Sequence, residues 1–446
     1  MGHAVVTLSL SRRADRVPDR TAVVDISEDY RYAPAETVHE NRVSYAELSE
    51  ITAETGARLE SIGIDAGDTV CLLTRNRIAS LALLFACRRL GATFAPISHL
   101  LTPVTVEYPF DVLEPTLLIA ETAQRDLVHS APIADDQVLT LSELADIDVS
   151  DTDANRQSQL DTPRPRVGDD QDAETEHPLL LLHGEGGHPV VAYSAQALEW
   201  NCIAAMTTWG LSKGDTVPLI TPLSAYDGLL RVALPTVYAG GTLLLDRAFD
   251  PGDMLTAIER EEATLLSGRT ATLRGLASKS DFPDALESLS FVAPDVSVPR
   301  SALEPYREAG ISLARVYGRL ECPFACAQEP AEQTNAVTAA GTDDERRYVG
   351  HPVLDCRVRV RGADDGDGAG SRIEGATEGR LALSGPVLAD GYAGTANEPA
   401  VDQDRLDERT DDHETNTADR AQFANGWLET TDLCRRDNDG QFTIAQ

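Results

Sequence analysis

A glycine-rich segment near the middle of the chain has the composition of a phosphate-binding loop. Residues 183–189 read His-Gly-Glu-Gly-Gly-His-Pro, after four leucines and before two valines. Glycines let backbone N–H groups approach phosphate oxygens, while hydroxyls and a lysine commonly balance the phosphate charge. Glu185 would instead bring negative charge toward a phosphate. The segment is therefore either a phosphate loop with altered chemistry or a glycine-rich turn between two strands kept for its shape.

Two carboxylates follow short apolar runs further along the chain. Glu321 ends the segment Val-Tyr-Gly-Arg-Leu-Glu at residues 316–321, and Asp432 ends Trp-Leu-Glu-Thr-Thr-Asp at residues 427–432. One carboxylate is enough to hold Mg²⁺, because that ion keeps most of its own waters. A carboxylate also makes strong, directional hydrogen bonds to hydroxyl groups. A tyrosine–glycine pair at a strand end and an aspartate in a turn are also compatible with a purely structural role.

Three segments resemble the AMP-forming acyl-adenylate family, which comprises the acyl-CoA synthetases and their relatives. Residues 425–446 resemble that family's G-W-x-x-T-G-D-x-x-x-x-D-x-x-G-(Y/F)-x-x-I segment, residues 316–321 its Y-G-x-T-E segment, and residues 179–191 its T-S-G-T-T-G-x-P-K-G loop. The resemblance covers essentially the whole chain. Within the family, the segments around Trp200 and Trp209 look most like the fatty-acyl-CoA synthetase branch.

The resemblance implies a role for each matched position. Asp432 would hold the ribose hydroxyls of ATP, Tyr317 would stack beside the adenine, and Glu321 would bind Mg²⁺ and act in catalysis. The other nucleotide-binding positions that it implies are Gly318, Leu320, Gly184 and Gly187. It also implies ATP or AMP with Mg²⁺ and coenzyme A as cofactors, and a small carboxylic acid as the other substrate. An active member joins the acid to AMP, releases pyrophosphate, and passes the acyl group to coenzyme A.

Several positions depart from the family pattern. Val190 stands at the lysine of the phosphate loop, and Leu320 at the threonine of Y-G-x-T-E. Ser224 and Ala225 replace the aromatic residue and the histidine of P-L-F-H-x-x-G, and Asp295 lies in the family's G-G-A segment. We therefore expect a divergent acyl-CoA synthetase, either slow or completed by a lid domain on another polypeptide. The alternatives are a non-catalytic relative that binds a nucleotide or acyl ligand as a regulator or assembly partner, and a decayed copy without activity.

Hydrophobic periodicity predicts an α/β fold built from a duplicated unit. Residues 44–62 have the pattern of a helix that opens on a capping box, and residues 78–90 have that of a second helix. Short apolar strands follow each helix, an alternation typical of parallel sheets covered on both faces. Residues 63–70, which end in Gly-Asp-Thr-Val, are echoed by residues 210–217. Two related α/β lobes with a ligand cleft between them are expected.

The expected organisation is four segments. Residues 1–145 form the first α/β lobe, residues 146–176 an acidic linker, residues 177–340 the second α/β lobe with the degenerate phosphate loop, and residues 341–446 a smaller β-rich lobe. The last segment ends at the family's hinge, so we expect the C-terminal lid domain to be absent. Acidic or turn-forming residues dominate three stretches that are expected to be poorly structured, residues 146–176, 362–376 and 400–424.

Charge and cysteine content indicate the setting of the protein. There are 38 basic and 73 acidic residues, a net charge of −35, and lysine occurs only at Lys213 and Lys279. This composition predicts a cytoplasmic protein of an extremely halophilic archaeal cell, and it argues against nucleic acid or anionic lipid as a partner, since those need a basic face. Seven cysteines without a Cys-x-x-Cys pair favour reduced, buried thiols. No signal peptide or membrane span is expected, and the oligomeric state is not indicated.

Folding should depend on salt. Like charges repel strongly in dilute buffer, whereas at ~1 M salt the screening length falls to about 3 Å. Circular dichroism across a KCl series should therefore show loss of structure well below ~1 M. A chain that is equally stable in dilute buffer would contradict the halophile interpretation.

Overall fold

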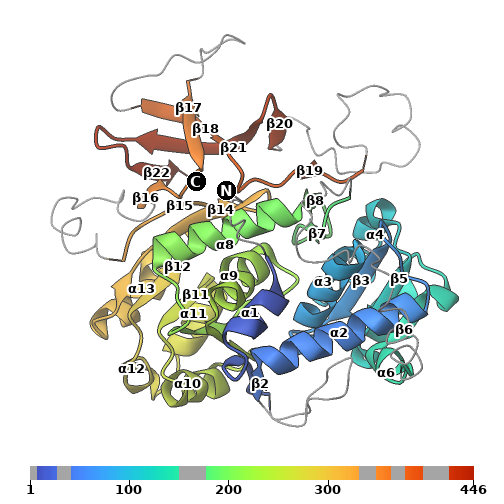
Figure 1. Cartoon of the computed structure of the whole chain (residues 1–446). Helices are drawn as coiled ribbons and strands as arrows, with labels where there is room; N and C mark the ends of the chain where they lie inside the picture. The colour runs from blue at the N-terminus through green and yellow to red at the C-terminus, as the bar shows by residue number, and fades with distance from the viewer. Residues whose placement is uncertain are drawn as a thin grey trace, which may run out of the picture.

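The computed structural model describes residues 8–27, 42–149, 177–330, 348–362, 377–394 and 421–445. The three stretches expected to be poorly structured, 146–176, 362–376 and 400–424, lie outside these residues except at one end of each. The described residues form three sheets, and helices pack against them (Figure 1). The α/β class and the smaller β-rich lobe are thereby confirmed.

The duplicated unit is present, and its two copies use the same hydrogen bonds. The first copy comprises α2 (Tyr45–Ser61), β3 (Thr69–Thr74), α3 (Ile78–Leu90) and β4 (Thr93–Ser98), and the second α8 (Ala195–Trp209), β9 (Thr216–Leu219), η3 (Asp227–Ala233), α9 (Leu234–Ala239) and β10 (Thr242–Leu245). In the first copy, the Asp68 carboxylate accepts from the backbone N–H of Asp65 at 2.7 Å. Asp215 does the same with Ser212 at 2.7 Å. Each aspartate then accepts a threonine hydroxyl through its other oxygen, at 3.0 and 2.8 Å respectively.

Local sequence signals account for the helix ends in the first copy. Ser44 Oγ accepts from the backbone N–H of Glu47 at 3.2 Å, and the Glu47 carboxylate accepts from the backbone N–H of Ser44 at 2.7 Å, so the expected capping box is formed. At the other end of the unit, Gly91 ends α3 with φ 75°, a left-handed conformation that glycine adopts without strain.

Two of the sheets are built mainly from parallel strands. One has the order β19-β8-β7-β4-β3-β5-β6, and the other β13-β12-β11-β9-β10-β1-β2. Their remaining strands are β1 (Thr21–Asp25), β2 (Arg42–Ser44), β5 (Leu117–Ala120), β6 (Val138–Thr140), β7 (Leu180–His183), β8 (Val190–Tyr193), β11 (Leu265–Gly268), β12 (Phe291–Pro294), β13 (Ser312–Leu313) and β19 (Gly391–Tyr392).

The two sheets exchange strands across the domain boundaries predicted from the sequence. β1, from the first predicted lobe, pairs in parallel with β10 of the second, and β7, from the second, pairs with β4 of the first. Residues 1–145 and residues 177–340 therefore do not each form a sheet of their own. The physical reason is that a strand edge presents unpaired N–H and C=O groups, which any strand that reaches it can satisfy regardless of its place in the sequence.

The third sheet is antiparallel and begins earlier than residue 341. Its order is β14-β15-β16-β22-β21-β18-β17, with β20 also pairing with β21. The strands are β14 (Val316–Arg319), β15 (Cys322–Ala327), β16 (Tyr348–Pro352), β17 (Arg357–Arg361), β18 (Thr377–Ser384), β20 (Gln422–Ala424), β21 (Trp427–Arg436) and β22 (Phe442–Ala445). β14 and β15 thus belong to the β-rich lobe, although the sequence placed them in the second α/β lobe.

The remaining helices cover the parallel sheets. They are α1 (Leu10–Arg16), α4 (Glu107–Leu113), α5 (Arg125–Ser130), α6 (Leu141–Ala145), α10 (Pro251–Arg260), α11 (Thr270–Ala277), α12 (Phe282–Ala285) and α13 (Arg300–Glu308), with short 3₁₀ turns η1 (Thr122–Gln124) and η2 (Asp135–Gln137). α8 lies beneath the antiparallel sheet (Figure 1), and Asn201 on it donates to the carbonyl of Val387 at 2.9 Å. No described helix has the length and apolar character needed to cross a bilayer.

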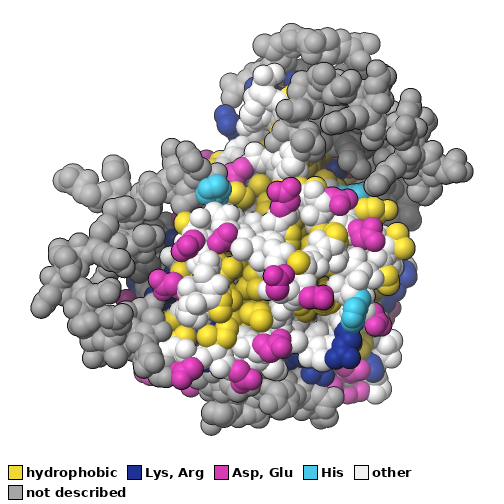
Figure 2. Space-filling view, turned by 90° about the vertical axis from the view of Figure 1, so that its right-hand side faces the viewer, with side chains coloured by type: hydrophobic (Ala, Val, Ile, Leu, Met, Phe, Trp, Pro, Cys, Tyr) yellow, Lys and Arg dark blue, Asp and Glu magenta, His cyan; other side chains and the backbone are white. Residues whose placement is uncertain are grey.

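The charge and cysteine expectations can be followed on the folded chain. Figure 2 shows acidic side chains spread over one face of the molecule and not gathered into a single patch. This spread is the distribution that the salt prediction assumes. All seven cysteines are buried and free, as expected.

Candidate nucleotide and acyl site

The predicted site residues come together where the three sheets meet. The glycine-rich loop joins β7 to β8 in one parallel sheet. Arg269 and Asp295 directly follow β11 and β12, which are neighbours in the other parallel sheet and pair Gly268 with Pro294. Carboxyl ends of parallel strands are where open α/β sheets bind their ligands. Tyr317 on β14 and Asp432 on β21 approach from the antiparallel sheet.

A cluster of five side chains occupies the antiparallel side of this junction. Tyr317 and Asp432 are 115 residues apart in sequence, yet the Tyr317 hydroxyl donates to Asp432 Oδ2 at 2.5 Å. Arg319 Nη1 donates to the same oxygen at 2.6 Å, and its Nε donates to Glu321 Oε2 at 3.4 Å. The hydroxyl of Tyr392 donates to Glu321 Oε1 at 2.7 Å. We call Tyr317, Arg319, Glu321, Tyr392 and Asp432 the Tyr317–Asp432 cluster.

Protonation and exposure in this cluster suit hydroxyl recognition. Burial, together with the charge of Asp432, raises the pKa of Tyr317 well above its ordinary value, so its hydroxyl stays a donor. The Asp432 side chain is 28% exposed, and its Oδ1 accepts no hydrogen bond from the described residues. A partly exposed carboxylate with one free oxygen fits a pair of ribose hydroxyls.

Glu321 is in a different position. Its side chain is only 6% exposed, and both of its oxygens are taken, one by Arg319 and one by Tyr392. Among the described residues there is also no group of three or more histidine, cysteine or acidic side chains that could hold a metal ion. Each oxygen of Glu321 thus has one protein donor and keeps a lone pair for the single-carboxylate contact that Mg²⁺ needs. Its predicted metal and catalytic roles stay predictions.

The glycine-rich loop is a tight turn held by its own backbone. The Gly184 N–H donates to the carbonyl of Pro189, and the Gly187 N–H to the carbonyl of Gly184, both at 2.9 Å. Gly187 has φ 93°, and a Cβ there would lie 2.6 Å from the Thr105 carbonyl oxygen, so glycine is required. Val190, at the position of the family lysine, is 3% exposed and packs in the core.

His183 and Leu320 have structural partners. Ser98 donates its backbone N–H to His183 Nε2 at 3.0 Å, and His183 Nδ1 lies 2.6 Å from the Gly184 carbonyl oxygen. Burial lowers the pKa of His183, which keeps the ring neutral. The hydrogen bond from Ser98 fixes the start of the loop to the end of β4. Leu320 contributes its carbonyl, which accepts the hydroxyl of Tyr193, so this predicted nucleotide position connects β8 to the β14–β15 turn.

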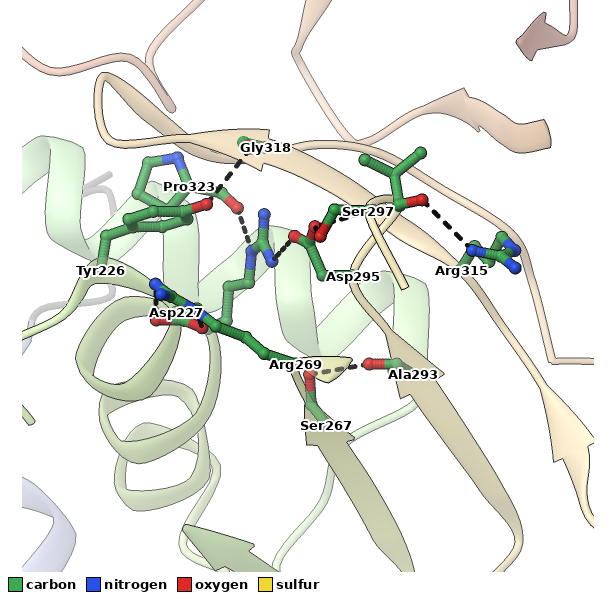
Figure 3. Close-up of polar contacts among 12 residues, drawn as sticks. Tyr226, Asp227, Ser267, Arg269, Ala293, Asp295, Ser297, Arg315, Gly318 and Pro323 are labelled. Atoms are coloured by element: carbon green, nitrogen blue, oxygen red, sulfur yellow. Dashed lines mark hydrogen bonds and ion pairs between the residues drawn. The ribbon is translucent and has the colours of Figure 1, made fainter. Parts of the chain in front are cut away.

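A second cluster, which contains two arginines, has no counterpart among the site residues predicted from the sequence. η3 is a π-helical segment, and it brings Asp227 and the fully buried Arg231 to the junction. Arg231 donates to Asp295 Oδ2 at 2.7 Å and to the Pro323 carbonyl at 2.5 Å. Arg269 lies nearby and holds Asp227 through two hydrogen bonds (Figure 3). We call Tyr226, Asp227, Arg231, Arg269 and Asp295 the two-arginine cluster.

The two-arginine cluster includes two residues of the segment that matches P-L-F-H-x-x-G, Tyr226 and Asp227. Tyr226 lies between the guanidinium groups, whose Cζ atoms are 5.0 and 5.9 Å from its ring centre, and its hydroxyl reaches the Gly318 carbonyl at 3.5 Å. An aromatic ring thus stands two residues after Ser224, where the motif aromatic is lost. The signal that could have found this cluster is a single arginine, Arg231, in the apolar run at residues 229–234.

Breaking the Arg231–Asp295 pair should destabilise the fold in a pH-dependent way. Burial opposes ionisation of Asp295, but the Arg231 guanidinium and the Ser297 donors outweigh burial and lower its pKa. Arg231→Met leaves that largely buried carboxylate with its two Ser297 donors but without the positive charge beside it, a loss of about 3–5 kcal/mol at neutral pH. In the variant the pKa of Asp295 rises above its unfolded value, so the cost is present above that value and shrinks as acid protonates the group.

Urea unfolding at constant high KCl over a pH series measures this effect. The double variant Arg231→Met/Asp295→Leu removes both charges and should regain most of the lost stability. A stability gap between wild type and Arg231→Met that stays constant from neutral to acidic pH would show that Asp295 is not the group left unpaired.

Comparison with known proteins agrees with the motifs. A model of the AMP-binding enzyme family matches residues 10–393. Feruloyl-CoA synthase from Amycolatopsis sp is 26% identical over 408 residues, which cover 90% of this chain and 73% of that protein. Indoleacetate–CoA ligase from Aromatoleum aromaticum is 27% identical over 420 residues, covering 91% and 73%. The structure of O-succinylbenzoate coenzyme A synthetase from Bacillus subtilis with ATP and magnesium ion matches with a TM-score of 0.71 at 20% identity, covering 98% of this chain and 78% of that one. The chain belongs to the AMP-binding enzyme family, and coenzyme A ligases are among its relatives.

Proposed function

We propose that the protein is an AMP-forming acyl-CoA synthetase, which converts a carboxylic acid, ATP and coenzyme A into acyl-CoA, AMP and pyrophosphate. The observation that carries the proposal is the hydrogen bond between Tyr317 and Asp432. Two motif positions that the family uses for a nucleotide are retained, and strands from distant parts of the sequence bring them into contact. The free oxygen of Asp432 faces partly exposed space, as a ribose-binding carboxylate must.

Each part of the site has a proposed task. Asp432 and Tyr317 hold the nucleoside, with Gly318 beside them. Glycine is needed at that position because a Cβ would lie 2.1 Å from the Pro323 carbonyl oxygen, so the two strands can pack closely there. The phosphates lie toward Gly184 and Gly187. Magnesium enters with ATP as part of the substrate, and its ligands on the chain are not assigned. The acid lies beside Tyr226, in the segment that matches the P-L-F-H-x-x-G motif.

The acid and the cellular setting are also proposals. Similarity of motifs to the fatty-acyl-CoA synthetase branch favours a fatty acid, whereas the two relatives described above are named for feruloyl and indoleacetate substrates. An acidic composition and seven free cysteines support the cytoplasm of a high-salt archaeal cell.

A non-catalytic nucleotide-binding relative is the second candidate. Specific observations favour it: Val190 is packed in the core where the family has a lysine, and both oxygens of Glu321 are held by protein donors. Electrophilic groups that meet developing phosphate charge typically contribute a factor of about 10² to 10³ in rate each. A site that lacks the loop lysine could keep its ligand and lose its turnover.

Replacing Asp432 should weaken nucleotide binding. Asp432→Ala removes a charged hydrogen-bond acceptor from the ribose, a loss of about 1.5–3 kcal/mol in the binding of ATP or AMP. Titration calorimetry in high KCl measures it. Asp439→Ala is the matched control, because Asp439 is an exposed aspartate in the turn that follows the same strand. Equal affinities of wild type and Asp432→Ala would remove the ribose assignment.

Pyrophosphate release separates the two candidate functions. Typical enzymes turn over at about 10 s⁻¹, and without the loop lysine the rate should be at least about a hundred-fold lower. The assay uses Mg-ATP, coenzyme A and a panel of fatty and aromatic acids in high KCl. Slow release that depends on the added acid supports the synthetase. Nucleotide binding with no release for any acid supports the non-catalytic relative, and several turnovers per second would show that other groups replace the lysine.

A further inference from the structure

Arg269 holds its two carboxylate partners in unequal ways. Its Nε and Nη2 grip the two oxygens of Asp227 at 2.5 and 2.9 Å, a two-point contact with a side chain that is only 7% exposed. Its Nη1 donates to Glu185 of the glycine-rich loop, whose side chain is 84% exposed. The first contact is buried and fixed by geometry, whereas the second is a surface contact of the kind that contributes little to stability.

Glu185 puts a carboxylate in the loop that is proposed to bind the phosphates. The loop around it is open, because a Cβ added at Gly186 would meet no atom within 4 Å. The backbone N–H groups of Glu185 and Gly186 make no hydrogen bond to the described part of the chain. The Glu185 carboxylate thus holds Arg269 Nη1 at a loop whose backbone offers two donors without a partner among the described residues.

Charge balance in this region favours an exchange of that carboxylate for a ligand oxyanion. The guanidinium groups of Arg231 and Arg269 face three carboxylates, those of Asp227, Asp295 and Glu185. With Glu185 in contact, the group therefore carries one net negative charge and repels a phosphate. When Glu185 turns into solvent, the remaining charges balance, and Arg269 Nη1 is free to donate while Asp227 keeps the guanidinium in place (Figure 3).

We propose that Arg269 is the cation that contacts the phosphates of the nucleotide, in place of the missing loop lysine, and that Glu185 is a built-in competitor that must leave Arg269 first. The inference rests on the proposed nucleotide site and adds two residues to it. Arg269 reaches the loop from the end of β11. Its charge therefore comes from a different sheet from the one that contains Val190. Binding of the phosphates and release of Glu185 are then one competitive step, and no covalent bond is formed or broken.

The test measures the affinity of inorganic tripolyphosphate and of ATP by calorimetry in high KCl, with Mg²⁺ held constant. Glu185→Gln removes the competing charge and should strengthen both affinities about three- to tenfold. Arg269→Gln should weaken both at least about tenfold, since it removes a charge-assisted donor. In the Arg269→Gln background, Glu185→Gln should change neither affinity, because the two residues act through one contact.

Controls distinguish this role from a general charge effect and from loss of folding. Glu287→Gln makes the same charge change at an exposed residue two positions after α12, an element that Figure 1 shows far from β7 and β8, and should leave both affinities unchanged. Arg269→Gln leaves Asp227 buried without its partner, so Arg269→Gln/Asp227→Asn is measured beside it, and circular dichroism checks both.

The inference and the proposed function fail in different ways. If AMP binds and Asp432→Ala weakens it, but Glu185→Gln and Arg269→Gln leave ATP and tripolyphosphate affinities as in wild type, the phosphate role of Arg269 is wrong and the nucleotide site stands. Equal gains from Glu185→Gln with and without Arg269 would also overturn the inference. If neither AMP nor ATP binds the wild type, the proposed function fails and the inference fails with it.

Discussion

A charge buried where three sheets meet must have a partner, because an unpaired ion there costs several kcal/mol. This constraint explains the arrangement of the site better than any single motif. Arg231 pairs with Asp295, Arg269 with Asp227, and Arg319 with Asp432. Each pair joins elements that are distant in sequence. Two of these arginines also reach another sheet, Arg231 through the Pro323 carbonyl on β15 and Arg269 through Glu185 in the loop between β7 and β8.

Arginine suits this task in a chain that has almost no lysine. A planar guanidinium can serve two carboxylates on separate edges, whereas an ammonium is a compact point charge. Arg319 contacts both Asp432 and Glu321, and Arg269 contacts both Asp227 and Glu185. With 73 acidic residues, the chain has carboxylates in excess, and two arginines at the junction, Arg269 and Arg319, are each shared by two carboxylates. A ligand oxyanion that is to reach Arg269 therefore has to replace a carboxylate that is already in contact.

The fold class and one half of the site could be predicted from the sequence. The duplicated unit was visible as paired Gly-Asp turns, because local spacing determines the hydrogen bonds that Asp68 and Asp215 make. Motif positions alone predict that Tyr317 and Asp432 belong to the same nucleotide site. Strand order could not be predicted, since apolar periodicity indicates a strand but not which sheet edge it joins. β1 and β7 therefore lie in the sheet opposite to the one assigned from the sequence.

The two-arginine cluster could not be predicted for a related reason. Its ion pairs join residues 42 to 84 positions apart, and no spacing in the sequence connects Arg269 to Glu185 or Arg231 to Asp295. Glu185 was expected to oppose phosphate simply because it is negative. In the structure, Arg269 neutralises Glu185. Under the proposal above, a ligand oxyanion can therefore take the place of the Glu185 carboxylate on Arg269.

The central claim is that the Tyr317–Asp432 cluster is the nucleotide-binding face of this protein. A crystal structure with AMP, grown in high KCl, tests it most directly. The account predicts ribose hydroxyls within hydrogen-bond distance of Asp432 and the adenine beside Tyr317. AMP bound elsewhere on the molecule, with Asp432 still held only by Tyr317 and Arg319, would contradict it.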